Sequence, residues 1–144
     1  MTIIGKKLKM TQIFKDDTSI PVTVIKVVKK EDLDTLKEGD FVIATGITKG
    51  KGFQGVVKRY SFAGGPKTHG QKNRYRAPGS IGATAPQRVI PGRKMAGRMG
   101  GATKTIRNLK VVQVNAERQT MLLRGSVPGN ANSRIKLRKV ERIK

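Results

Sequence analysis

Short apolar runs alternate with polar turns in the first third of the chain. Residues 22–27 are almost continuously β-branched, and a polar turn at 16–19 separates them from the mixed apolar stretch 3–14. This arrangement predicts a β-hairpin. A second turn, at 38–40, leads into another predicted strand at 41–45.

The same pattern returns near the C-terminus. Residues 109–114 and 120–124 flank a short polar turn and predict a second hairpin, and after a Pro/Gly/Asn turn at 125–133 the apolar Ile135 and Leu137 alternate with Arg and Lys. Six short strands and no long helix indicate a mainly β fold, either a small antiparallel barrel or a sandwich. Closure into a barrel is attractive because it leaves no exposed strand edge.

The middle of the chain lacks this pattern. We therefore expect three parts, namely residues 1–48 and 106–144 as the two parts of a barrel and residues 49–105 as an irregular extension between them. The extension holds twelve of the seventeen Gly and four of the six Pro. A connection longer than about 15 residues without structure of its own is usually functional or disordered. Because it joins two strands of one sheet, its ends are expected to lie near each other.

The charge of the extension indicates what kind of molecule it binds. Between Phe41 and Ala116 there are fifteen Lys and Arg and no Asp or Glu, in a chain of net charge +22. Such a segment repels itself and needs a polyanion, which favours nucleic-acid binding. A membrane is the weaker partner, because no run approaches the roughly 20 apolar residues of a spanning helix. The acidic cluster at 31–40 is either a solvated loop turned away from the polyanion or a contact with a basic neighbouring protein.

Catalytic chemistry is poorly represented. The absence of Cys excludes disulfides and thiolate metal sites, and the single histidine, His69, has no carboxylate or second ligand near it in sequence. We therefore expect no enzyme activity, no cofactor, no metal and no small-molecule substrate. His69 is expected to contact RNA or simply to pack.

One glycine motif needs separate consideration. Gly50 to Gly55 formally match G-x-G-x-x-G, but a dinucleotide site also needs a helix and a following acidic residue, and the next acid is Glu117. We expect these glycines to let the backbone approach phosphates, with Lys49 and Lys51 neutralising the phosphate charge. The alternative is a flexible strand exit with solvated lysines.

Aromatic residues lie among the cations of the extension. Tyr75 stands between two arginines, a pattern typical of stacking on unpaired bases. For Phe53 and Phe62, burial against the barrel explains the sequence at least as well as RNA contact.

Taken in order, seven segments resemble the ribosomal protein L3 family of the large subunit. They are residues 5–14, 20–25, 46–59, 68–70, 78–82, 92–100 and 127–129. The resemblance covers nearly the whole chain. It implies a closed six-stranded barrel of the translation-protein type and an extension that reaches through ribosomal RNA toward the peptidyl-transferase region. It also implies a role in early subunit assembly, neighbouring ribosomal proteins as partners, and a cytoplasmic ribosome, with an organellar ribosome as the other possibility.

Site residues follow by position. The resemblance makes residues 49–59 and 67–76 RNA-gripping arms and residues 88–98 a return arm. The residues expected to contact RNA are Lys49, Lys51, Lys58, Arg59, Lys67, His69, Lys72, Arg74, Tyr75, Arg76, Arg88, Arg93, Lys94 and Arg98. The expected tip consists of Gly79, Ser80, Ile81, Gly82, Ala83, Thr84, Ala85, Pro86 and Gln87.

The chain departs from the family pattern in two places. A substantial insert of the family shrinks here to residues 29–40, and residues 83–85 stand where some bacterial members have glutamine-rich sequence with a methylated glutamine. That modification is therefore not carried over. The alternative function is a free-standing RNA chaperone or general nucleic-acid-binding protein, and a nucleotide-using enzyme would rest on Gly50 to Gly55 alone.

Overall fold

The structure, a computed structural model, describes residues 2–140. Met1 and residues 141–144, the outer ends of the two expected barrel parts, lie outside this range. The chain divides into two compact units. One runs up to Lys49 and resumes at Gly101, and we call it the sheet unit; the other, Gly50–Gly100, we call the basic unit.

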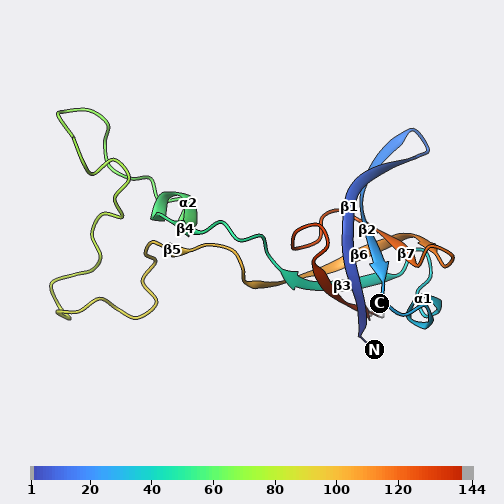
Figure 1. Cartoon of the computed structure of the whole chain (residues 1–144). Helices are drawn as coiled ribbons and strands as arrows, with labels where there is room; N and C mark the ends of the chain where they lie inside the picture. Colours follow the sequence, from blue (N-terminus) through green and yellow to red (C-terminus); the bar gives the residue numbers. More distant parts are fainter. Residues whose placement is uncertain (1, 141–144) are drawn as a thin grey trace. The chain divides into compact units, whose positions relative to one another are not determined.

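Six strands make up the sheet unit (Figure 1). They are β1 (Ile3–Lys15), β2 (Thr18–Val27), β3 (Phe41–Ile47), β6 (Thr103–Asn115), β7 (Thr120–Arg124) and β8 (Arg134–Val140). Their order is β1-β2-β7-β6-β3-β8, all neighbours are antiparallel, and β8 pairs with β1 again. Each of these strands therefore has two hydrogen-bonded neighbours. The mainly β fold with six strands is confirmed.

Both predicted hairpins are present. β1 and β2 join through Asp16 and Asp17, which both have positive φ, as the tight two-residue turns of hairpins require. β6 and β7 pair across the polar turn that begins after Asn115. β6 starts at Thr103, so residues 103–105, expected in the irregular extension, are strand instead. They pair with the last residues of β3, which also runs further than expected, to Ile47.

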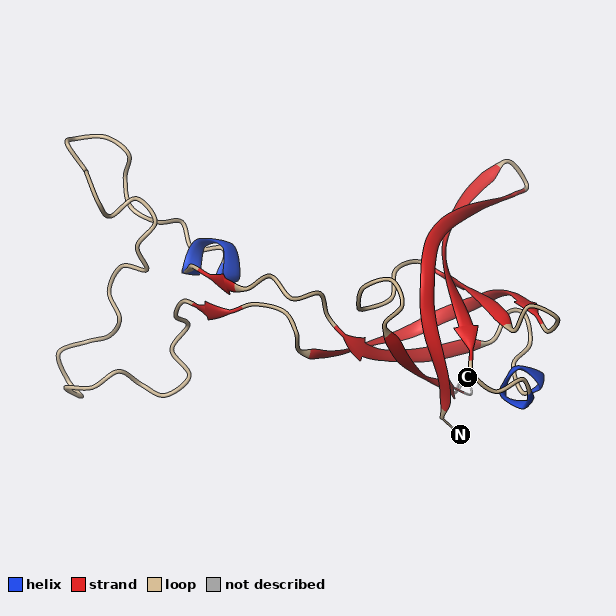
Figure 2. Ribbon diagram, viewed as in Figure 1, coloured by secondary structure: helices blue, strands red, loops and turns tan. Residues whose placement is uncertain are grey.

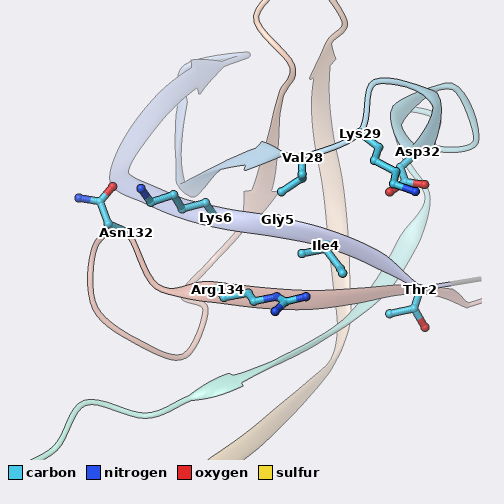
Figure 3. A pocket seen from close by; sticks show the side chains of 9 residues that line it. All are labelled: Thr2, Ile4, Gly5, Lys6, Val28, Lys29, Asp32, Asn132 and Arg134. Atoms are coloured by element: carbon cyan, nitrogen blue, oxygen red, sulfur yellow. The ribbon is translucent and has the colours of Figure 1, made fainter.

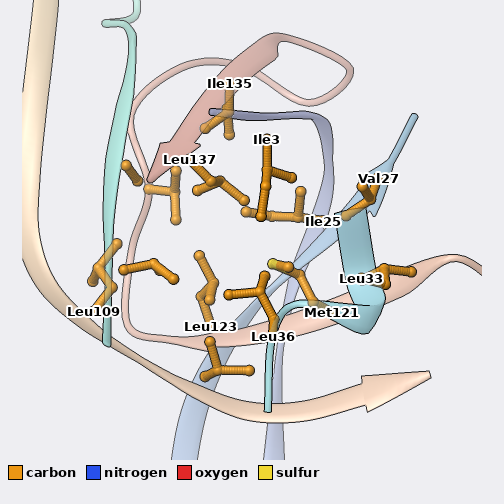
Figure 4. Packing of buried hydrophobic residues seen from close by; sticks show 14 residues of the cluster. Ile3, Ile25, Val27, Leu33, Leu36, Leu109, Met121, Leu123, Ile135 and Leu137 are labelled. Atoms are coloured by element: carbon orange, nitrogen blue, oxygen red, sulfur yellow. The ribbon is translucent and has the colours of Figure 1, made fainter. Parts of the chain in front are cut away.

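The core follows from side-chain alternation along the strands. Fourteen buried residues form one cluster, shown in Figure 4: Ile3, Ile25, Val27, Leu33, Leu36, Val42, Ala44, Leu109, Val111, Met121, Leu123, Val127, Ile135 and Leu137. All but three of them lie on the six strands. Leu33 and Leu36 come from the link between β2 and β3, where a short helix, α1 (Glu31–Asp34), replaces the fully solvated loop that was one expectation for this segment.

Loop dominates the basic unit (Figure 2). Its regular elements are α2 (Val56–Tyr60) and a two-stranded sheet of β4 (Phe53–Gln54) and β5 (Gly97–Arg98). Met99 accepts a hydrogen bond from the Lys51 amide at 2.9 Å. Within the sheet unit, the amide of Thr48 donates to the carbonyl of Ala102, also at 2.9 Å. The expectation that the two ends of the extension lie near each other is confirmed.

Candidate nucleic-acid interface

Nearly all the predicted RNA-contacting side chains face solvent. Thirteen of them are exposed, namely Lys49, Lys51, Lys58, Lys67, His69, Lys72, Arg74, Tyr75, Arg76, Arg88, Arg93, Lys94 and Arg98. The basic unit contains no Asp or Glu, so none of its cations is neutralised within the unit. The result is an exposed and uncompensated positive charge spread along an irregular backbone. Such a surface attracts phosphates without needing a groove.

Arg59 is the exception. It is half-buried, its Nη1 donates a hydrogen bond to the carbonyl of Met95 at 2.8 Å, and its Cζ lies 5.0 Å from the centroid of the Tyr60 ring. A Cβ on Gly97 would come within 2.7 Å of the same Nη1. Arg59 thus ties α2 to the returning chain. Phosphate contact was the only role that the sequence suggested for Arg59. The structure gives it a different role, which is to hold the basic unit together.

The aromatic residues separate into two groups. Phe53 is 76% exposed, so burial, one of its two expected roles, is wrong for this residue. Phe62 is half-buried, and its ring centroid lies 6.3 Å from that of Tyr60. Tyr75 is 38% exposed, and its hydroxyl donates to the carbonyl of Gln71, which fixes the ring at the surface. Phe53 and Tyr75 are therefore the exposed aromatic side chains of the basic unit, whereas Tyr60 and Phe62 are half-buried.

Two glycines allow the segment around Tyr75 to fold back on itself. The amide of Gly65 donates to the carbonyl of Tyr75 at 3.1 Å. Gly64 has a φ of 81°, and a Cβ there would lie only 2.1 Å from the same carbonyl oxygen. Only glycine fits this position. The close approach closes a loop between Gly65 and Tyr75, and His69 lies within that loop.

The predicted tip is fully exposed and carries no charge. All residues from Gly79 to Gln87 face solvent, and the Ser80 hydroxyl turns back onto the carbonyl of Gly82 at 3.1 Å. The Arg93 guanidinium donates to the carbonyl of Ser80, which links the tip to the return arm. A shallow cavity of about 260 Å³ lies beside the tip, lined by Ile81, Gly82, Ala83, Gln87, Arg88 and Val89.

Lys49 differs from the other predicted residues because it belongs to the sheet unit. Its charge acts on Lys7, a buried lysine of β1 that donates hydrogen bonds to the carbonyls of Val127 at 2.7 Å and Gly129 at 3.0 Å. Burial lowers the pKa of the Lys7 ammonium, and the charge of Lys49 lowers that pKa further. No local pattern marks Lys7, because its role depends on a loop 120 residues away.

A second cavity lies on the sheet unit and was also missed from sequence (Figure 3). Its volume is about 430 Å³. The lining residues come from three stretches of the chain: Thr2, Ile4, Gly5, Lys6, Val28, Lys29, Asp32, Asn132 and Arg134. Apolar side chains and three cations share this wall with one carboxylate. No local sequence pattern marks the cavity, because the sheet alone brings these stretches together.

Residues 2–140 carry neither a metal-binding cluster nor a membrane-spanning helix. In this range no three His, Asp or Glu side chains are grouped so that they could hold a metal ion. The helices described there are too short and too polar to cross a membrane.

Comparison with known proteins identifies the family. The family model described as ribosomal protein L3 matches residues 20–121. Large ribosomal subunit protein uL3 of Chlorobaculum tepidum is 53% identical over 106 residues, which cover 73% of this chain and 51% of that protein. Its counterpart in Chloroherpeton thalassium is 54% identical over 102 residues, 70% of this chain and 49% of that protein. The chain thus spans about half the length of these relatives.

A longer alignment covers almost the whole of this chain and of one relative. Large ribosomal subunit protein uL3 of Dehalococcoides mccartyi is 36% identical over 198 aligned residues, which take in 95% of this chain and 97% of that protein. Since this chain has only 144 residues, the alignment includes positions at which it has no counterpart. It is shorter than this relative inside the aligned region. The extent and identity of these matches show that the chain belongs to the ribosomal protein L3 family.

Proposed function

We propose that this protein is a structural constituent of the large ribosomal subunit and that its basic unit binds ribosomal RNA. One observation carries the proposal: in a chain of the L3 family, the acid-free unit Gly50–Gly100 presents its cations to solvent on an irregular backbone. The family is one of structural ribosomal proteins and not of enzymes, which agrees with the expectation from sequence.

Binding is driven mainly by phosphates. Each cation that meets a phosphate releases counterions from the RNA, so the binding constant falls steeply as salt is raised. Arms of irregular backbone follow the shape of folded RNA more closely than a rigid sheet, and exposed aromatic rings such as Phe53 and Tyr75 stack on splayed bases. Recognition therefore reads RNA shape and unpaired bases and not a linear sequence.

The uncharged tip has a different task. Residues 79–87 carry no cation to hold phosphates, while the arms on either side do. We assign the grip to the arms, and we assign to the tip an approach toward the peptidyl-transferase region, where it positions RNA without taking part in chemistry. Binding by the arms at an early stage would also help the subunit to assemble.

The sheet unit serves as the folded base. Its cyclic strand order supports a closed barrel of the translation-protein type. We further propose that the shortening relative to longer family members falls at residues 29–40, where α1 and the buried Leu36 cover one end of the core in place of a larger insert. Large-subunit RNA and neighbouring ribosomal proteins are the proposed partners, in a cytoplasmic ribosome.

A high-salt wash tests this function. Large subunits are isolated from cells that produce the tagged chain and are sedimented after washing at rising salt. A constituent whose basic unit is enclosed by folded RNA dissociates slowly even when its equilibrium affinity has fallen, so we expect it to remain at about one copy per subunit. Loss of the chain at moderate salt would favour the free-standing RNA chaperone instead. An established constituent of the same subunits, followed in the same gradients, is the control.

A further inference from the structure

The far part of the first hairpin stands apart from the rest of the sheet. β1 pairs with β8 only from Ile3 to Lys6, and β2 pairs with β7 only from Val22 to Lys26. The two strands nevertheless continue to pair with each other as far as Lys15 and Thr18. Residues 10–20 thus form a two-stranded projection, which we call the β1–β2 arm (Figure 1).

One face of the arm exposes large apolar side chains. Side chains alternate between the two faces of a strand, so Met10, Gln12 and Phe14 share one face of β1. Met10 is 50% exposed and Phe14 is 73% exposed. On the opposite face, Ile13 pairs directly with Ile20, and both are half-buried. Among the large apolar side chains described in the sheet unit, Phe14 has the largest exposed fraction, and it shares its face of the arm with Met10.

The charge of the arm has the opposite sign to that of the whole protein. Its charged residues are Lys15, Asp16 and Asp17, and all three are exposed. The two carboxylates form the turn at the end of the arm, directly after Phe14 and Lys15. In a chain of net charge +22, a negatively charged end is a distinct local feature. It repels phosphates and attracts Lys and Arg.

We propose that the β1–β2 arm docks a basic segment of a neighbouring protein, whose apolar side chains cover Phe14 while its Lys or Arg side chains pair with Asp16 and Asp17. The proposal rests on the proposed ribosomal function and adds to it a surface for protein contact, separate from the RNA-binding basic unit. Aromatic side chains are favoured anchors at such contacts, and surrounding charges select the partner.

RNA is the less suitable occupant. A base could stack on Phe14, but its phosphates would then lie close to Asp16 and Asp17. The arm offers a single cation, Lys15, against these two carboxylates. In the basic unit, by contrast, Tyr75 lies between Arg74 and Arg76 with no acid nearby in sequence. We therefore expect Phe14 to contact protein and Tyr75 to contact RNA.

Site-specific photocrosslinking compares them directly. The photoreactive analogue p-benzoylphenylalanine is placed at position 14 or at position 75 of the full chain, each variant is incorporated into large subunits, and the particles are irradiated. We expect the position-14 probe to crosslink to a protein peptide that contains Lys or Arg, and the position-75 probe to crosslink to ribosomal RNA. A position-14 crosslink to RNA, or to an acidic peptide, would overturn the inference.

The position-75 result keeps the two proposals distinguishable. If position 75 reaches ribosomal RNA and position 14 also reaches RNA, the proposed function stands and the arm inference fails. If position 75 fails to reach RNA in incorporated particles, the RNA-binding role of the basic unit fails, whatever position 14 contacts.

A paired substitution tests the role of charge. Asp16→Asn with Asp17→Asn removes both carboxylates and preserves the turn, because Asn also accepts positive φ. We expect the protein crosslink from position 14 to fall several-fold in this variant, with the crosslink from position 75 unchanged. An unchanged position-14 yield would contradict a basic partner.

Discussion

Lys7 shows how one buried side chain organises the sheet unit. Its ammonium joins β1 to the carbonyls of Val127 and Gly129, and its backbone amide donates to Ser133 at 3.0 Å. Gly129 in turn packs against the end of β3, where a Cβ would come within 3.0 Å of the Ile47 carbonyl oxygen. Lys7 therefore holds the 127–133 loop beside β3, the strand from which the chain leaves the sheet unit.

Replacing this lysine tests that role. Lys7→Met keeps the aliphatic stem but leaves two buried carbonyls without a donor, so we expect a loss of about 1–3 kcal/mol in the free energy of unfolding. Denaturant unfolding measures the loss, with Lys26→Met, at an exposed position of β2, as the control. Equal stability of the two variants would contradict the bridging role.

A comparison of the wild type with Lys7→Met over a range of pH also reports the titration of Lys7. Because the pKa of Lys7 is below its ordinary value of 10.5 in the folded chain, the unfolded chain binds the proton more tightly. As pH rises through the folded pKa toward 10.5, the folded state gains stability in the wild type and not in Lys7→Met. The difference in free energy of unfolding between the wild type and Lys7→Met should therefore widen with rising pH.

The exposure of most cations of the basic unit could be predicted from sequence, but inward contacts could not. The acid-free composition predicted a polyanion partner, and the family resemblance selected cations such as Lys67 and Arg76, which are exposed. Arg59 looks no different in sequence, yet it turns inward because the carbonyl of Met95, 36 residues away, accepts its hydrogen bond. Contacts of this kind depend on the folded path of the chain and leave no local pattern.

At the scale of elements, strands and hairpins were predictable because alternation and turn residues are local signals. The short helices were not. α1 has four residues and no side-chain cap, and α2 has five residues with Gly55 before it. Neither is long enough to show a helical period. The acidic residues around α1 also suggested solvent exposure, although Leu33 and Leu36 between them are buried.

α1 makes a testable contribution to the core. Leu33 is 1% exposed and lies in the main cluster, so Leu33→Ala should cost roughly 2–4 kcal/mol by removing buried methyl groups and leaving a cavity. The exposed neighbour Asp34→Ala is the matched control, with an expected change within about 0.5 kcal/mol. Thermal and denaturant unfolding measure both variants. Equal small effects would mean that the 29–40 link is dispensable to the core.

At the scale of the whole molecule, the two units divide the work. The sheet unit buries an apolar core, and the extension begins and ends on it. The basic unit buries few residues and exposes most of its charged side chains. The division was visible in the sequence as a change from alternating to glycine-rich, acid-free composition. The exact boundary was not, since residues 103–105 look like loop and become strand only by pairing with β3.

A charge-matched comparison tests the central claim most directly. One variant replaces the exposed Lys67, Lys72, Arg74 and Arg76 of the basic unit with Gln. Its control replaces the exposed Lys26, Lys110, Lys136 and Arg138 of the sheet unit in the same way. Both full-length variants lose the same charge, so any difference between them reports position and not net charge. Binding to a large-subunit ribosomal RNA transcript is measured across a range of salt concentrations.

We expect the basic-unit variant to bind more weakly and the slope of log K against log salt to shrink by about 3, because each lost phosphate contact removes roughly 0.7–0.9. The sheet-unit variant should keep most of the wild-type slope. Equal losses in the two variants, or an unchanged slope in the basic-unit variant, would contradict the assignment of RNA binding to residues 50–100.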